Sequence, residues 1–127
     1  MSPQEKYRIE VQAVAEYLPA QSDPAGERHV FAYHITITNH GTLAARLISR
    51  HWLIEDGAGK TQEVRGEGVV GEQPLLAPGE SYRYSSGASL SAEVGTMRGS
   101  YQMVAEDGMR FEANIPPFVL AMPRVLH

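Results

Sequence analysis

The stretch Gly66–Gly71 has the spacing G-x-G-x-x-G, in which glycines can bring backbone N–H groups close to a phosphate. In a dinucleotide-binding protein this spacing follows a strand and begins a helix, whose N-terminus receives the pyrophosphate. Here Pro74 and Pro78 follow closely, and their backbone restrictions leave room for less than two helical turns. We therefore expect a turning loop that uses the conformational freedom of glycine. A phosphate-binding loop is the alternative, with the candidate residues Gly66, Gly68 and Gly71.

The charges around this stretch also disfavour a phosphate. Glu67 and Glu72 would lie beside the bound anion, and only Arg65 is near enough in sequence to offset them. A kinase-type glycine loop needs no helix, but it needs a lysine on a nearby strand in a context such as V-A-I-K. The two lysines of the chain, Lys6 and Lys60, have no such context.

Histidines are the next candidates for chemistry, as metal ligands. Metal sites favour close histidine pairs on one element or histidine–carboxylate clusters. His29 and His34 are five residues apart on an expected strand and so face opposite sides, and His51 beside Trp52 is expected to be half-buried and hydrogen-bonded. We predict no metal site and no cofactor. The five histidines are His29, His34, His40, His51 and His127.

Nucleophilic catalysis finds little support. The chain has no cysteine, which excludes disulfides, thiolate zinc sites and a thiol nucleophile. No serine lies in G-x-S-x-G, and Ser85-Ser86 is expected to pack across neighbouring strands. Glu55-Asp56 is interpreted as the start of a turn. We predict that the protein is not an enzyme.

Composition limits the remaining classes. The 127 residues suit one domain, with 43% apolar residues and no run long enough to span a membrane. The net charge is −4, and the 11 basic residues are dispersed, which argues against a nucleic-acid surface. No apolar segment of a signal peptide follows Met1, so we expect a cytoplasmic protein.

Strands must position these residues, because alternation of polar and apolar residues is the dominant pattern. No segment of ten or more residues shows a helical period, and no repeat is present. Asp56-Gly57-Ala58-Gly59 is a strong hairpin signal. The expected strands cover residues 7–17, 29–38, 45–55, 60–65, 81–87, 96–105 and 109–115, with a short edge piece at 118–121 after Pro116-Pro117.

About seven short antiparallel strands in one chain of this length indicate an all-β, immunoglobulin-like or fibronectin type III-like β-sandwich. The side chains expected in the core are Trp52, Ile54, Tyr101, Met103 and Phe111, and Met109 should also face inward. Tyr101 lies where such sandwiches place a tyrosine whose hydroxyl bonds back to the chain, the tyrosine corner. A core tyrosine without that bond is the alternative.

The third expected strand is apolar on both faces, which breaks the rule that one face of a sandwich strand is polar. With Ile48, Trp52 and Ile54 toward the core, Leu47 and Leu53 should lie outside with His51 between them. An apolar strip with a polar rim is typical of a contact surface. The predicted protein-interaction surface is Leu47, His51, Leu53, Val69 and Val70, with strand ends, loops or a second subunit as alternative covers.

Several longer strings resemble one known family, the ApaG family. The strand string is Phe31-Ala32-Tyr33-His34-Ile35-Thr36-Ile37-Thr38-Asn39, and the loop string is Val69-Val70-Gly71-Glu72-Gln73-Pro74-Leu75-Leu76-Ala77-Pro78-Gly79-Glu80. Shorter strings are Ser49–Ile54, Tyr84–Gly87, Met97–Met103 and Ile115–Phe118. The resemblance runs from about Tyr7 to Leu120, so a single domain would occupy residues 1–127, with a core at 7–121 and a polar tail at 1–6.

The resemblance implies a fibronectin type III-like sandwich that mediates protein–protein contacts. It also implies links to cobalt and magnesium handling and to diadenosine polyphosphate metabolism, and it supplies no catalytic residues. We therefore expect a non-enzymatic module with a protein partner, possible self-association, and no nucleic-acid or membrane partner.

Overall fold

The structure is a computed structural model, and it describes residues 5–123. Only Glu5 and Lys6 of the predicted polar tail are among these residues. The described part contains no helix long and apolar enough to cross a membrane. Its elements are β1 (Ile9–Tyr17), the 3-10 turns η2 (Pro19–Gln21) and η3 (Pro24–Gly26), β2 (His29–Asn39), β3 (Ala45–Asp56), β4 (Thr61–Glu67), β5 (Leu75–Leu76), β6 (Ser81–Leu90), β7 (Val94–Ala105) and β8 (Arg110–Ala121).

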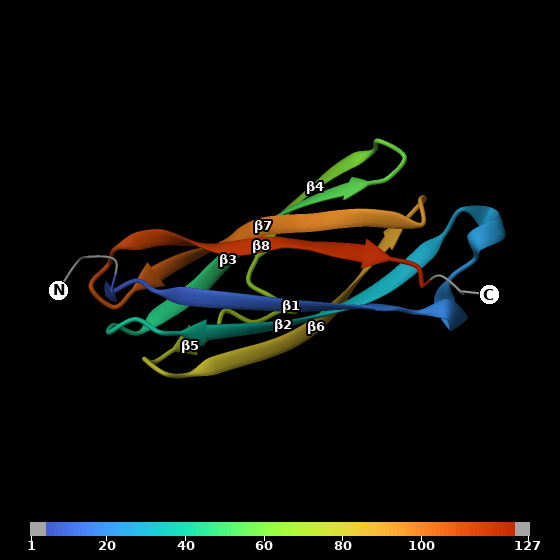
Figure 1. The fold of residues 1–127 in the computed structure, drawn as a ribbon. Coiled ribbons are helices and arrows are strands. Elements are labelled where there is room, and N and C mark those ends of the chain that lie inside the picture. The colour runs from blue at the N-terminus through green and yellow to red at the C-terminus, as the bar shows by residue number, and fades with distance from the viewer. Residues whose placement is uncertain (1–4, 124–127) are drawn as a thin grey trace.

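The strands form two antiparallel sheets that face each other (Figure 1). One sheet has the order β1-β2-β6, and the other has the order β4-β3-β7-β8, with the short β5 pairing to the start of β3. This arrangement confirms the predicted all-β sandwich of the fibronectin type III-like kind. The strand missed by sequence reasoning is β5, which has only two residues and therefore no alternation to recognise.

The core between the sheets is organised around Trp52. The Trp52 ring lies 5.4 Å from the ring of Tyr33, measured between centroids, and it also makes edge contacts with Tyr101 and Phe118. Trp52, Ile54, Tyr101 and Met103 are buried as predicted, and Phe111 packs against this core while half-buried. Met109 is 50% exposed, so its predicted inward position is wrong; it lies in the turn before β8 begins.

Tyr101 makes no corner bond to the backbone in the described residues. Its hydroxyl pairs instead with the hydroxyl of Tyr84 on β6, so the bond joins the two sheets through the core. Burial raises the pKa of both tyrosines well above the ordinary range, because the charged phenolate would lose its water. The pair therefore stays neutral and hydrogen-bonded.

A β-bulge in β3 changes which side chains face the core. The register of β3 against β7 shifts between Leu47 and Ser49, so Ile48 is an extra residue in the strand. Leu47 pairs with Met103 and is completely buried, whereas Ser49 pairs with Gln102 on the outer face. The predicted outward position of Leu47 is therefore wrong. Because of the extra residue, Leu47 and the residues before it face the opposite way from what regular alternation, counted back from Trp52, would give.

β8 also contains a bulge, at the two prolines expected to end it. Met97 pairs with Phe118 and Gly99 pairs with Ile115, so Pro116 and Pro117 lie opposite a single residue of β7. Prolines are tolerated in strands at bulges because the missing N–H is not needed there. The strand thus continues to Ala121 instead of ending at residue 115.

Candidate functional site

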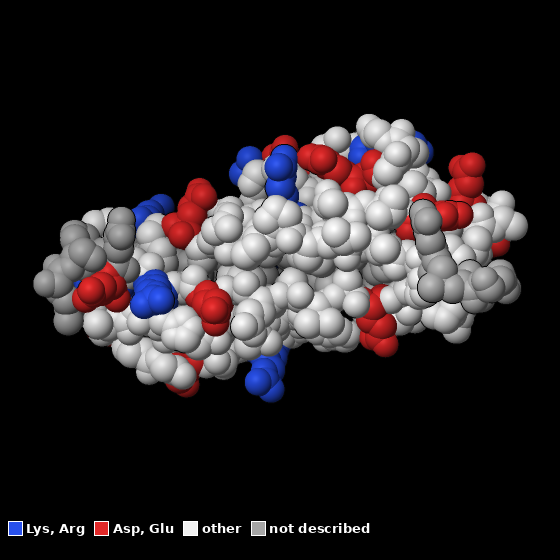
Figure 2. Space-filling model, viewed as in Figure 1, with Lys and Arg blue, Asp and Glu red and all other residues white. Residues whose placement is uncertain are grey.

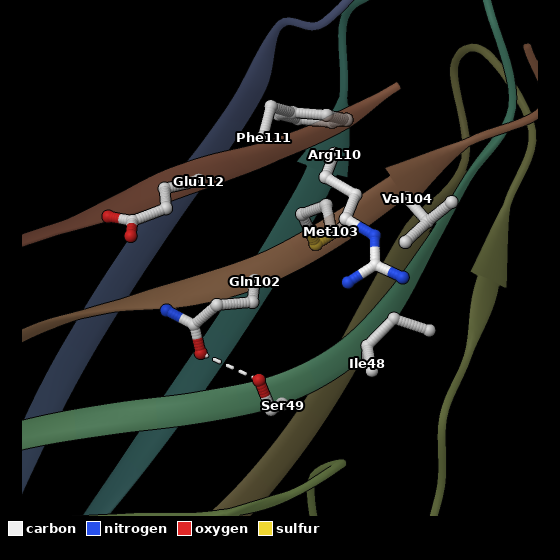
Figure 3. A pocket seen from close by; sticks show the side chains of 8 residues that line it. All are labelled: Ile48, Ser49, Gln102, Met103, Val104, Arg110, Phe111 and Glu112. Atoms are coloured by element: carbon white, nitrogen blue, oxygen red, sulfur yellow. Dashed lines mark hydrogen bonds between the residues drawn. The ribbon is translucent and has the colours of Figure 1, made fainter. Parts of the chain in front are cut away.

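A hollow lies on the outer face of the five-stranded sheet, across β3, β7 and β8 (Figure 3). Its volume is about 560 Å³. We call it the outer-face hollow. Its lining residues are Ile48, Ser49, Gln102, Met103, Val104, Arg110, Phe111 and Glu112.

The bulge in β3 supplies one wall of the outer-face hollow. Ile48, the extra residue, is half-buried at the hollow, and Ser49 beside it donates a hydrogen bond from Oγ to Oε1 of Gln102 at 2.7 Å. This bond joins neighbouring strands and fixes the polar side of the wall. Figure 3 shows Arg110 extending over the hollow toward Ile48, while Glu112, the neighbour of Gln102 on the next strand, points away from Arg110. The result is an apolar floor with charged groups at its rim.

A second, smaller hollow of about 290 Å³ continues along the same face. Both hollows are lined by Glu112, and His51 and Leu53 line the smaller one. His51 and Leu53 are half-buried on the outer face, where His51 Nε2 lies 3.2 Å from Oε1 of Glu63 on β4. The structure therefore places two of the predicted contact residues next to the outer-face hollow.

The comparisons with known proteins decide the family. A family model described as the ApaG domain matches residues 19–105, which is more than half of the chain. Protein ApaG of Aromatoleum aromaticum is 69% identical over 127 residues and covers both chains completely. The chain belongs to the ApaG family. Protein ApaG of Azoarcus sp. is likewise 69% identical over the full length of both chains.

Solved structures agree with this assignment. A crystal structure of a Bordetella pertussis protein under the name ApaA is 53% identical and superimposes with a TM-score of 0.92. The alignment covers 97% of this chain and 100% of that one. A protein from Archaeoglobus fulgidus, at 10% identity and a TM-score of 0.51, shares the fold alone.

Two of the predicted contact residues are not on the surface of this ApaG domain. Leu47 and Val69 are both completely buried, so their prediction as surface residues is wrong. Leu47 enters the core because of the bulge, and Val69 anchors the loop after β4 as part of the core cluster. Val70, next to it, is 64% exposed. Ile48 and Val104 take the place of Leu47 in the outer apolar surface.

The glycine stretch of the ApaG domain is a turn built on Val69 and Glu72. These two residues exchange backbone hydrogen bonds of 2.8 and 2.9 Å, and the N–H of Gly68 donates to the carbonyl of Ile48. Gly68, Val70 and Gly71 all have positive φ, as a tight turn of this kind requires. The backbone N–H groups of Gly68, Val69 and Glu72 are therefore used internally, and no helix follows in the described chain. These observations favour the turning role expected for the glycines.

Sequence reasoning overlooked Arg50, which faces into the sandwich. Its Nη1 donates to the carbonyls of Glu67 and Gly68 at 3.0 and 2.9 Å, which holds the end of β4 in place. A side chain at Gly66 would meet the Arg50 guanidinium at 2.7 Å, so this glycine leaves space for the arginine. The signal was available, because the alternation that directs Trp52 inward directs Arg50 inward too.

On the first sheet His34 and His40 form cross-strand pairs, whereas His29 is buried. His34 Nε2 lies 3.1 Å from Glu16, and its Nδ1 lies 2.6 Å from the hydroxyl of Ser85, while His40 pairs with Glu10. These side chains are exposed on the outer face of β1, β2 and β6, and Ser85 packs across strands as predicted. Among residues 5–123 no three His, Asp or Glu side chains gather as metal ligands would. His127 lies outside the described residues.

Proposed function

We propose that this ApaG domain is a protein-interaction module that binds its partner through the outer face of β3, β7 and β8. The observation that carries the proposal is the outer-face hollow, about 560 Å³ in volume, with an apolar floor on a sheet face that should be polar. Exposed apolar concavities with polar rims are typical of contact surfaces. Arg110 and Glu112 at the rim offer one charge of each sign for orientation of the partner.

The experiment is affinity capture from a lysate of the native organism, with the wild-type chain and two matched variants. Val104→Asp places a charge in the outer-face hollow, near the exposed Arg46 with which Val104 pairs, so the fold should tolerate it. Val14→Asp places the same charge on the opposite sheet, where Val14 is 64% exposed. We expect Val104→Asp to lose a partner that wild type and Val14→Asp both retain.

Capture that survives in Val104→Asp, with unchanged circular dichroism, would place the contact surface elsewhere. The links to cobalt and magnesium handling and to diadenosine polyphosphate metabolism are part of the same proposal. We expect the identity of the captured partner to show which of them applies.

A further inference from the structure

The two sides of the sandwich differ in how their strand edges are covered. β1 and β8 run side by side, so each covers the edge of the other sheet (Figure 1). On the opposite side, β4 and β6 end their sheets, and no strand of the described chain pairs with their outer edges. An uncovered strand edge is a template for pairing with another chain. The edge of β4 has the chemistry to select one partner.

The backbone of β4 presents alternate residues to this edge. Asp56 bonds to Lys60 and Ile48 bonds to Gly68 through the backbone, at the two ends of the β3–β4 ladder. Because bonding alternates along an antiparallel ladder, the even-numbered residues of β4 point their N–H and C=O groups at β3. The odd-numbered residues point theirs away from β3. These outward residues are Thr61, Glu63, Arg65 and Glu67.

The charges of these outward residues fix a register for self-pairing. If two β4 strands pair antiparallel with Val64 opposite Val64, then Glu63 of each copy lies opposite Arg65 of the other. All seven residues of β4 pair in this register. A register centred on Glu63 or on Arg65 pairs fewer residues and places like charges opposite each other. Charge complementarity therefore selects the register centred on Val64.

We propose that two copies of this chain associate through antiparallel pairing of their β4 strands, centred on Val64. The Glu63–Arg65 pairs then lie on the outer face of a continuous sheet, because these residues pair with Leu53 and His51 of β3. Glu63 and Arg65 already lie 2.9 Å apart within one copy, so the four side chains form an alternating set of charges. The half-buried Val64 residues meet on the inner face and extend the core.

A seven-residue strand pair buries less area than a standard stable interface, so the association should depend on concentration. Sedimentation equilibrium of the full chain, up to about 1 mM, should show a reversible dimer. Glu63→Arg alone and Arg65→Glu alone each create two like-charge contacts and should weaken association at least about tenfold. A mixture of the two variants should form a heterodimer, because every charge then meets its opposite.

The matched control is the double reversal Glu55→Arg with Arg98→Glu. This exposed ion pair, 3.2 Å apart, lies on the same sheet but away from the edge of β4, so its reversal should leave association unchanged. A chain that stays monomeric at the highest concentration would overturn the proposal. A dimer that is insensitive to the two single reversals would also overturn it, and would assign the contact to β6 or another surface.

Disulfide trapping tests the register independently, because the chain contains no cysteine of its own. Val64→Cys places two thiols directly opposite each other in a non-hydrogen-bonded pair, at a Cα distance that a disulfide can span. Gln62→Cys, two residues away on the same face, would hold its thiols too far apart. Rapid covalent dimer formation by Val64→Cys alone is expected. Equal trapping of both variants, or of neither, would contradict the register.

Discussion

Val70 combines a β-branched side chain with a left-handed backbone, a conformation that such residues rarely adopt. Its φ is 49°, and it forms a two-residue turn with Gly71, whose φ is 78°. Asparagine followed by glycine is the usual sequence of such a turn. The strain is held by the buried Val69 and by the bond from Gly68 to Ile48, the residue that lines the outer-face hollow. Strain of this kind is often found at functional surfaces.

Val70→Asn should therefore raise the free energy of unfolding by about 1 kcal/mol, because asparagine adopts the left-handed conformation more readily. Urea unfolding followed by circular dichroism measures the change. Val14→Asn is the control, since the exposed Val14 lies in a regular strand where asparagine should lower stability slightly. A lower stability of Val70→Asn would contradict this account, because it would mean that contacts of the Val70 side chain stabilise the fold by more than its left-handed backbone destabilises it.

The hydroxyl pair of Tyr84 and Tyr101 predicts how stability depends on alkaline pH. Burial raises the folded-state pKa of both above the unfolded value of about 10, so the folded state retains protons that the unfolded state loses. Below pH 10 the two tyrosines make their full contribution to the free energy of unfolding. As the pH rises above 10 this contribution is lost, and the free energy of unfolding falls by at most about 1.4 kcal/mol per pH unit for each tyrosine. Tyr84→Phe with Tyr101→Phe should flatten the fall in unfolding free energy between about pH 10 and 11. Equal slopes in the double variant and wild type would contradict this assignment.

At the level of elements, alternation was enough to predict seven strands and most of the core. Trp52 and Ile54 lie inward, and Leu53 lies outward, because these residues follow the bulge of β3 in regular alternation. Leu47 precedes the bulge and could not be placed, since an inserted residue looks the same in sequence as a regular one. The outer-face hollow was missed for the same reason, because it depends on the outward position of Ile48.

The turn after β4 depends on two glycines in different ways. A side chain at Gly68, where φ is 62°, would lie 2.3 Å from the carbonyl oxygen of Glu72, whereas a side chain at Gly71 would meet open space. Gly68→Ala should therefore lower the free energy of unfolding by about 2 kcal/mol or more. Gly71→Ala should lower it by about 1 kcal/mol, because only the positive φ of Gly71 disfavours alanine there. Urea unfolding of the two variants compares them directly. Equal losses of unfolding free energy in the two variants would contradict this account, because they would mean that the loop moves to make room for a side chain at Gly68.

The same turn should not bind nucleotides usefully. Backbone donors of Gly68, Val69 and Glu72 are used within the protein, and acidic side chains flank the loop. Isothermal titration with ATP, GTP or a diadenosine polyphosphate should show no saturable binding tighter than about 100 μM, which corresponds to about 5.5 kcal/mol. Saturable binding that disappears in a folded Gly68→Glu variant would assign the phosphate role to these glycines after all.

At the scale of the whole molecule, acidic and basic side chains are interspersed, and the face drawn in Figure 2 has a central stretch without charged residues. The sandwich places the outer-face hollow and the open edge of β4 on the same five-stranded sheet, where β3 lines the hollow on one side and pairs with β4 on the other. A protein partner at the hollow and a second copy at β4 would thus use adjacent but separate parts of one sheet. Sequence alone could not show this, because the hollow joins residues of β3 to residues of the β7–β8 hairpin, which is distant from β3 in the chain.

The most direct test of the interaction surface is site-specific photo-cross-linking in the native organism, with a benzophenone side chain at position 104 or position 14. Val104 lines the outer-face hollow, and Val14 is exposed on the opposite sheet. Mass spectrometry after irradiation should find a recurring protein adduct from position 104 and none from position 14. Adducts with the same proteins from both positions, or from position 14 alone, would contradict a partner site on the outer face of β3, β7 and β8.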